Sequence, residues 1–88
     1  MSDDHDANDA IGHVTHYFGH LSVAAVALTE AVATGDRIHI KGHTTDIVQD
    51  VSSMQVDHAP VDGAKPGDDV AIHVEGHVRE HDLIFREA

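Results

Sequence analysis

The chain has 88 residues, enough for one small domain and too few for a multidomain enzyme. It carries 16 acidic and 5 basic side chains, for a formal net charge of -11 at pH 7. This charge opposes unguided binding to nucleic acid or anionic membranes, because such binding needs clustered Lys and Arg. There is no cysteine, which excludes disulfides and thiolate metal sites.

The N-terminal end differs in composition from the rest of the chain. Residues 1–10 contain four aspartates and little apolar surface to bury. We therefore expect residues 1–10 to form a disordered acidic tail and residues 11–88 to form the folded β domain. An acidic start does not fit a secretory signal, and the longest apolar run, residues 23–28, is far short of the roughly 18 residues of a membrane helix. We expect a cytoplasmic protein that does not bind membranes.

The acidity comes mainly from aspartate, with 12 Asp to 4 Glu, against three Arg and two Lys. This balance resembles that of halophilic proteins. At molar salt the Debye length is about 3 Å, so repulsion between surface carboxylates is largely screened. Two interpretations stay open: the acidity reflects a high-salt environment, or it forms a functional acidic surface.

From residue 11 onward, Gly-Asp, Pro-Gly and Gly-His pairs separate short apolar stretches, which is typical of a β domain. The first two predicted strands cover residues 11–18 and 22–29, with a hairpin turn at Gly19-His20. Residues 22–33 also contain Ala, Leu and Glu that favour helix. Their apolar residues form no continuous stripe and no strong N-cap precedes them, so we predict strand there.

Four further strands follow. Residues 37–41 alternate strictly between polar and apolar side chains, and residues 46–58 form a longer extended stretch with a bulge expected at Ser52-Ser53. The last two predicted strands cover residues 70–74 and 83–86. Six short strands without helix predict an all-β fold, specifically a six-stranded closed β-barrel, because closure removes exposed strand edges.

Ten histidines raise the question of a metal site, since neutral imidazole binds zinc, copper and nickel. On a strand, however, His13 and His16 point to opposite faces, and residues four apart lie about 13 Å from each other. We therefore expect no metal site and no bound cofactor. Pairing of histidines across strands stays open.

Residues 77–81, His-Val-Arg-Glu-His, match the H-x-x-E-H signature of inverted zinc peptidases. That chemistry needs both histidines on one helix, whereas this segment follows Gly76 between two predicted strands, so we do not assign it. The chain also lacks a phosphate-binding G-x-x-x-x-G-K-[ST] loop and a G-x-S-x-G nucleophile elbow. We predict that the chain is not an enzyme and does not bind GTP.

Several segments together resemble the second domain of translation elongation factors of the Tu class, which is a six-stranded β-barrel. The resemblance is carried by residues 34–40, 51–56, 64–72 and 78–84. The last of these has His81 where that family has Gly before the aspartate. The chain as a whole is similar to small stand-alone proteins that consist of this barrel alone.

The resemblance implies a non-catalytic binding module that contacts RNA or a translation-related ribonucleoprotein. The basic features that could meet phosphate are Arg37, Lys41, His43 and Lys65. The alternative is a protein–protein adaptor barrel that serves a separate enzyme or translation factor, since similar barrels are appended to other enzymes, including some peptidases. The choice between an RNA partner and a protein partner stays open.

Overall fold

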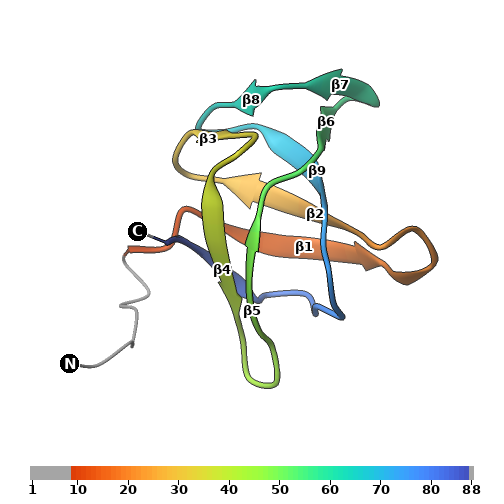
Figure 1. Ribbon diagram of the computed structural model, residues 1–88, viewed down its shortest axis with the longest axis vertical. Coiled ribbons are helices and arrows are strands. Elements are labelled where there is room, and N and C mark those ends of the chain that lie inside the picture. The colour runs from red at the N-terminus through yellow and green to blue at the C-terminus, as the bar shows by residue number, and fades with distance from the viewer. Residues whose placement is uncertain (1–8, 88) are drawn as a thin grey trace.

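The structure, a computed structural model, describes residues 9–87, so residues 1–8 of the expected acidic tail lie outside the described residues. Within residues 11–87, ten strands and the short 3-10 helix η2 form the domain (Figure 1). The elements are β1 (Gly12–Phe18), η2 (Gly19–Leu21), β2 (Val23–Leu28), β3 (Val32–Ala33), β4 (Arg37–Lys41), β5 (Asp46–Asp50), β6 (Met54–Val56), β7 (Ala59–Val61), β8 (Gly63–Ala64), β9 (Asp69–His73) and β10 (Leu83–Arg86).

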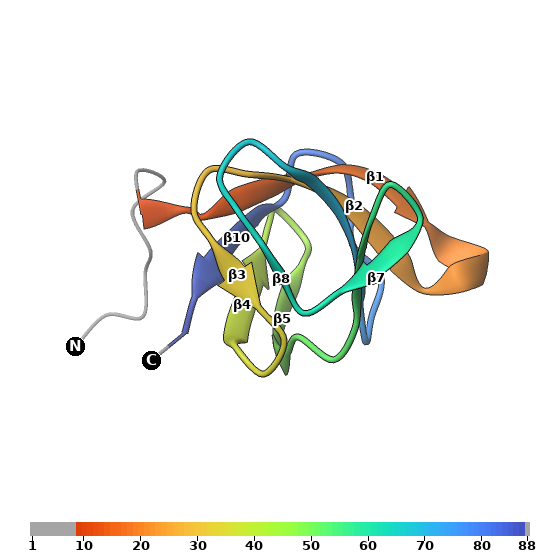
Figure 2. The same ribbon diagram turned by 90° about the horizontal axis from the view of Figure 1, so that it is seen from above.

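Eight strands form one antiparallel sheet in the order β5-β4-β10-β1-β2-β9-β6-β7, and β3 pairs with β8 in a separate two-stranded sheet. The large sheet curls strongly, so that β4 and β5 cross in front of β1 and β2 (Figure 1). Seen from above, the strands surround a common interior (Figure 2). Alternate residues point into this interior. In β9, for example, Val70 and Ile72 are buried while Asp69 is exposed.

The prediction of an all-β fold is confirmed, but the closed six-stranded barrel is wrong. Within residues 9–87, no backbone ladder joins β5 at one end of the large sheet to β9 or β7 at the other. The predicted long strand at residues 46–58 is divided in two, because its first part pairs with β4 and its second part with β9. The chain leaves one sheet end at Val51 and joins the other at Met54.

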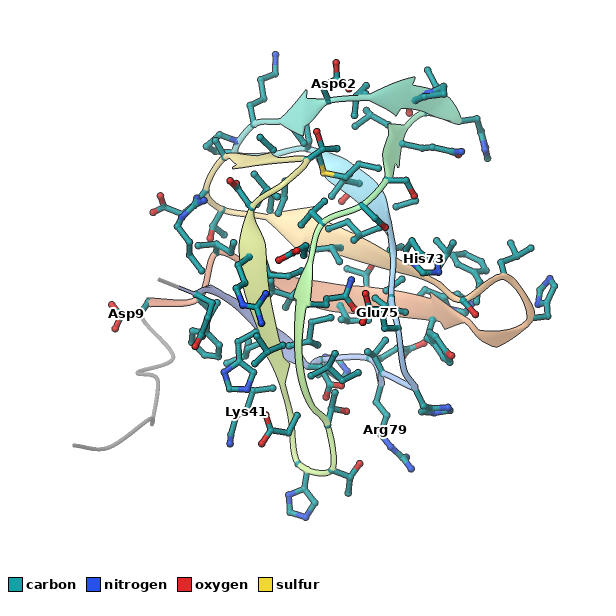
Figure 3. All side chains as sticks on the ribbon, in the orientation of Figure 1. Asp9, Lys41, Asp62, His73, Glu75 and Arg79 are labelled. Carbon is teal, nitrogen blue, oxygen red and sulfur yellow. The ribbon has the colours of Figure 1, made fainter. Side chains whose placement is uncertain are left out.

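The large sheet is not closed by backbone hydrogen bonds between β5 and the end of β9, and one side chain spans the opening between them. Gln49, buried on β5, donates from Nε2 to the carbonyl oxygen of His73 at 2.9 Å. Its Oε1 accepts from the backbone N–H of Glu75, also at 2.9 Å. Figure 3 shows His73 and Glu75 on the same side of the molecule, along the chain that continues from β9. One amide side chain therefore makes the two hydrogen bonds that a neighbouring strand would otherwise make there.

Three turns share one design, in which an aspartate closes a four-residue turn. In each turn, the backbone N–H of the aspartate donates to the carbonyl oxygen of the residue three positions earlier. The backbone N–H of that earlier residue donates in turn to the aspartate's carboxylate. The turns are Ala33–Asp36, Lys65–Asp68 and Arg79–Asp82. The third position has positive φ in all three, as a type II turn requires. It is Gly35, Gly67 and His81, with φ of 92°, 92° and 77°.

We expect His81→Gly to stabilise the domain. A side chain at positive φ costs about 1 kcal/mol relative to glycine, and His81 is exposed, so its removal loses little packing. For a domain of this size that gain corresponds to a rise in Tm of roughly 4–8 °C. Thermal unfolding followed by circular dichroism measures it. The matched control is His43→Gly, at an exposed turn histidine without positive φ. Equal Tm changes for the two variants would contradict the explanation.

Candidate functional site

A groove of about 730 Å³ lies beside the small β3-β8 sheet. Its floor is apolar and consists of Val32, Val56, Val61 and Ala64. We call the whole groove the valine groove. Val32 and Ala64 are buried, whereas Val56 and Val61 are half-buried and pack against the core. The floor residues come from four different strands, so the groove exists only after the sheets have assembled.

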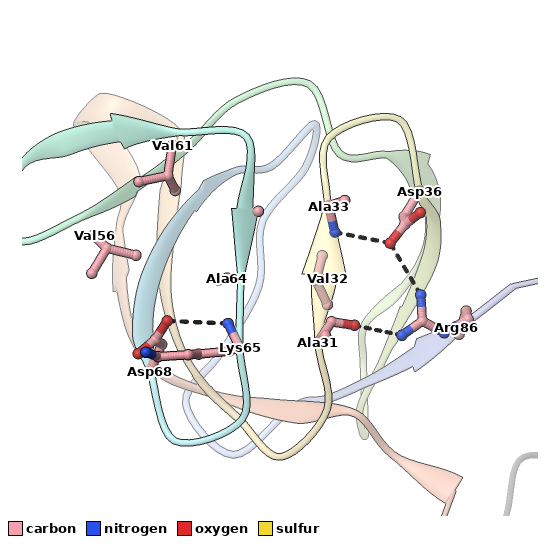
Figure 4. A pocket seen from close by; sticks show the side chains of 11 residues that line it. Ala31, Val32, Ala33, Asp36, Val56, Val61, Ala64, Lys65, Asp68 and Arg86 are labelled. Atoms are coloured by element: carbon pink, nitrogen blue, oxygen red, sulfur yellow. Dashed lines mark hydrogen bonds and ion pairs between the residues drawn. The ribbon is translucent and has the colours of Figure 1, made fainter.

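Charged side chains border the groove on both sides (Figure 4). On one side Arg86 forms an ion pair with Asp36, with 3.0 Å between Nη1 and Oδ2, and donates from Nη2 to the carbonyl of Ala31. On the other side lie Lys65 and Asp68, whose turn is closed by the Lys65 N–H bond to Asp68 Oδ2 at 3.1 Å. The groove thus offers an apolar floor between walls that carry both signs of charge.

The structure distributes the four predicted phosphate-contacting residues over several places. Arg37 begins β4 and pairs with Asp50 at 3.0 Å, and Lys41 ends β4 with its Nζ 3.7 Å from Asp46. His43 lies in the turn between β4 and β5, and Lys65 lines the valine groove. Two of the four are thus neutralised by acidic partners. Figure 3 shows Lys41 at the end of the molecule opposite Asp62.

His39 links β4 to an acidic residue on each side. It is buried, with Nε2 2.5 Å from Asp46 Oδ1 and Nδ1 3.8 Å from Glu87 Oε1. The hydrogen bond from His39 lowers the pKa of Asp46 below its usual value, and the positive charge of Lys41 lowers it further. These contacts join β4 to β5 and to the residue that follows β10.

We expect Asp46→Asn to reduce stability at neutral pH and not at strongly acidic pH. Because the pKa of Asp46 is lowered by folding, its carboxylate stabilises the folded state above its unfolded pKa of about 4. That contribution is lost as the pH falls through the folded pKa. Tm values of both proteins at pH 7 and near pH 2 measure the effect, with Asp62→Asn as a control for charge removal. If the Tm difference between the original chain and Asp46→Asn were equal at pH 7 and near pH 2, the stabilising role of the ionised Asp46 would be contradicted.

The histidines do not assemble a metal centre in the described part of the chain. Among residues 9–87, no group of three or more His, Asp or Glu side chains is placed to hold a metal ion. His77 and His81 lie in an irregular segment and a turn rather than on a helix. The His16 ring instead contacts Phe18, with ring centroids 4.4 Å apart and ring planes tilted by 59°, and its Nδ1 lies 3.4 Å from Glu80 Oε2.

No helix within residues 9–87 is long and apolar enough to cross a membrane. No family model matches the chain. An uncharacterised protease of Methanocaldococcus jannaschii, MJ0090, is 38% identical over 76 residues, which is 85% of this chain and 19% of that protein. The chain therefore spans about a fifth of the length of the curated relative that it matches.

Solved structures similar to the chain give its fold. The C-terminal domain of a Geobacillus thermoleovorans protein described as a U32 peptidase superposes with a TM-score of 0.87 at 17% identity, covering 98% of this chain and 100% of that one. Its selenomethionine variant gives a TM-score of 0.82 at 18% identity, covering 89% and 98%. The chain has the fold of a U32 peptidase C-terminal domain.

These comparisons overturn the resemblance to elongation factors of the Tu class. Both the sequence relative and the structural neighbours are named as peptidases, so the translation-factor identity is wrong, and with it the translation-factor-like function that the identity implied. The segments that suggested that family include the three aspartate-closed turns. Gly and Asp are favoured by this turn conformation itself, so other β domains with such turns also select them.

Proposed function

We propose that this chain is a non-catalytic β domain that binds unfolded polypeptide as part of the action of a U32-type peptidase. The observation that carries the proposal is the 38% identity to a stretch that makes up 19% of a protein named as a protease. Most of that protein lies outside the match, and we assign peptide-bond hydrolysis to that remainder.

The valine groove is the site that we assign to the polypeptide. An extended chain presents alternate side chains to one side, about 7 Å apart, and an apolar floor such as Val56 and Val61 can receive them. The walls supply both signs of charge, with Arg86 paired to Asp36 and Lys65 beside Asp68. A site of this kind favours apolar side chains in general and binds polypeptides of varied sequence.

The test uses reduced, carbamidomethylated ribonuclease A, labelled with fluorescein, as an unfolded probe, at about 0.5 M salt to screen net charge. We expect saturable binding by fluorescence anisotropy, with the probe intact afterwards on a denaturing gel. Val61→Glu should weaken binding by about tenfold or more, since it places a charge on the apolar floor. Val48→Glu, at a 41% exposed valine on β5, is the matched control.

Three results would overturn the proposal. The first is an absence of binding at millimolar concentrations of the chain. The second is an equal loss of affinity in the Val61→Glu and Val48→Glu variants, which would remove the groove as the site. The third is cleavage of the probe by the purified chain, which would show that the domain is catalytic.

A further inference from the structure

A second hollow, of about 400 Å³, lies on the outer face of the large sheet, where β1, β2, β6 and β9 meet. Its apolar lining includes Phe18, Leu21, Val23 and Ala71, and we call it the Phe18 hollow. Phe18 is 36% exposed and Leu21 is 59% exposed. Of the described residues that line it, none carries a carboxylate, although the chain has 16 acidic residues.

An acidic hollow of about 290 Å³ adjoins it and shares Gln55, His58 and Ala71 with it. Asp57 and Asp69 supply its two carboxylates. Within residues 9–87 neither carboxylate has an ion-pair partner, whereas Arg37, Lys41 and Arg86 are paired with other acids. The two hollows thus form one continuous surface that is apolar at one end and negatively charged at the other.

The backbone holds this surface in a defined geometry. Asp57 and His58 form the two-residue turn between β6 and β7, and both have positive φ, 53° and 66°, as in a type I′ hairpin turn. Asp69 is on β9, where its neighbour across the sheet is Ala27 of β2. Both carboxylates are therefore carried by strands or by a tight turn between strands.

The pairing register of β2 and β9 gives the distance between the apolar end of this surface and its acidic end. On the outer face, His73, Ala71 and Asp69 follow one another along β9, opposite Val23, Ala25 and Ala27 of β2. Two residues of a strand span about 7 Å and four span about 13 Å. Consider an extended ligand whose apolar side chain lies in the Phe18 hollow. The ligand residue two or four positions further along would then place its side chain near Asp69.

We propose that this face binds a cationic polypeptide segment, with an aromatic or aliphatic side chain in the Phe18 hollow and a Lys or Arg side chain at Asp57 and Asp69. The inference goes beyond the proposed function, because it assigns a second polypeptide-binding site on a face that shares no lining residue with the valine groove. Charge complementarity supports the choice of ligand, because two unpaired carboxylates attract a cation while the apolar end, free of carboxylates, accepts an uncharged side chain. The exposed Phe18 and Leu21 supply the apolar anchor.

The test measures fluorescence anisotropy of a labelled peptide, Lys-Ser-Lys-Ser-Phe-Ser-Lys-Ser-Lys, at about 0.15 M salt. Lysines on both sides of the Phe make the probe independent of binding direction. We expect weaker binding when the Phe is replaced by Ala and loss of binding when the lysines are replaced by Glu. In the protein, Leu21→Ser and the double variant Asp57→Asn/Asp69→Asn should each weaken binding by about fivefold or more.

A second double variant, Glu30→Gln/Asp62→Asn, removes the same net charge from exposed positions outside both hollows. It should leave the affinity within about twofold of the original, since long-range attraction is screened beyond about 8 Å. An equal loss in the two double variants would overturn the inference, because binding would then follow net charge. Unchanged binding in Leu21→Ser, or equal binding of the Glu-substituted peptide, would also overturn it.

The outcomes separate this inference from the proposed function. If unfolded ribonuclease A binds and Val61→Glu weakens it, while Leu21→Ser leaves peptide binding unchanged, the inference fails and the proposed function stands. If unfolded ribonuclease A does not bind at all, the proposed function fails, whatever the peptide does.

Discussion

Gly42→Ala should destabilise the domain by about 2–4 kcal/mol, a large part of the total stability of a chain of this size. A Cβ at Gly42 would overlap Asp82 Oδ1 and lie 2.5 Å from Asp82 Cγ. Asp82 is 5% exposed, and its Oδ2 accepts the Arg79 N–H at 2.8 Å. The added methyl group forces the carboxylate out of this hydrogen bond and so opens the turn that precedes β10.

Urea unfolding measures the effect, and two controls isolate its cause. Gly63→Ala should change stability by less than about 0.5 kcal/mol, because the nearest atom to its added Cβ is Val32 O, 3.5 Å away. In an Asp82→Ala background, Gly42→Ala should lose most of its cost, since the clashing carboxylate is gone. A full cost in that background would show that Asp82 is not the reason.

Gln49→Leu should cost about 2–4 kcal/mol. The substitution keeps a buried apolar stem but leaves the His73 carbonyl and the Glu75 N–H without the partner that the amide provides. Native-state hydrogen exchange should show faster exchange at Glu75, since the opening between β5 and the end of β9 is no longer bridged.

The control is Gln55→Leu, at an exposed glutamine of β6 that is paired in the sheet only through its backbone. It should change stability by less than about 0.5 kcal/mol. If Gln49→Leu unfolds at the same urea concentration as the original chain, water replaces the amide at the opening and the bridge has no energetic role.

Local patterns were sufficient to locate most strands. The alternation at residues 37–41 and the predicted strand at 83–86 coincide with β4 and β10, and the predicted strand at 70–74 overlaps β9 (Asp69–His73). The three short strands β3, β7 and β8 were missed, because two or three residues are too few to show a period. The division of residues 46–58 was also missed, since it depends on which partner strand each half meets.

The candidate sites could not be predicted from local sequence. The valine groove takes single residues from four strands, and Asp57 and Asp69 meet across a shared hollow without any motif. One local signal is present in the sequence: Tyr17 and Phe18 are adjacent in a strand, and adjacent side chains of a strand point to opposite faces, so one of the two is expected to face solvent. Phe18 does, while Tyr17 packs against the core.

Asp36 limits how the valine groove can be re-engineered. The same oxygen, Oδ2, accepts the Ala33 N–H that closes the turn and pairs with Arg86 on the groove wall. A substitution that alters this wall therefore also alters the turn before β4. Val56, Val61 and Lys65 also line the groove and take no part in the Ala33–Asp36 turn, so a library at these positions would test the proposed ligand preference without changing that turn.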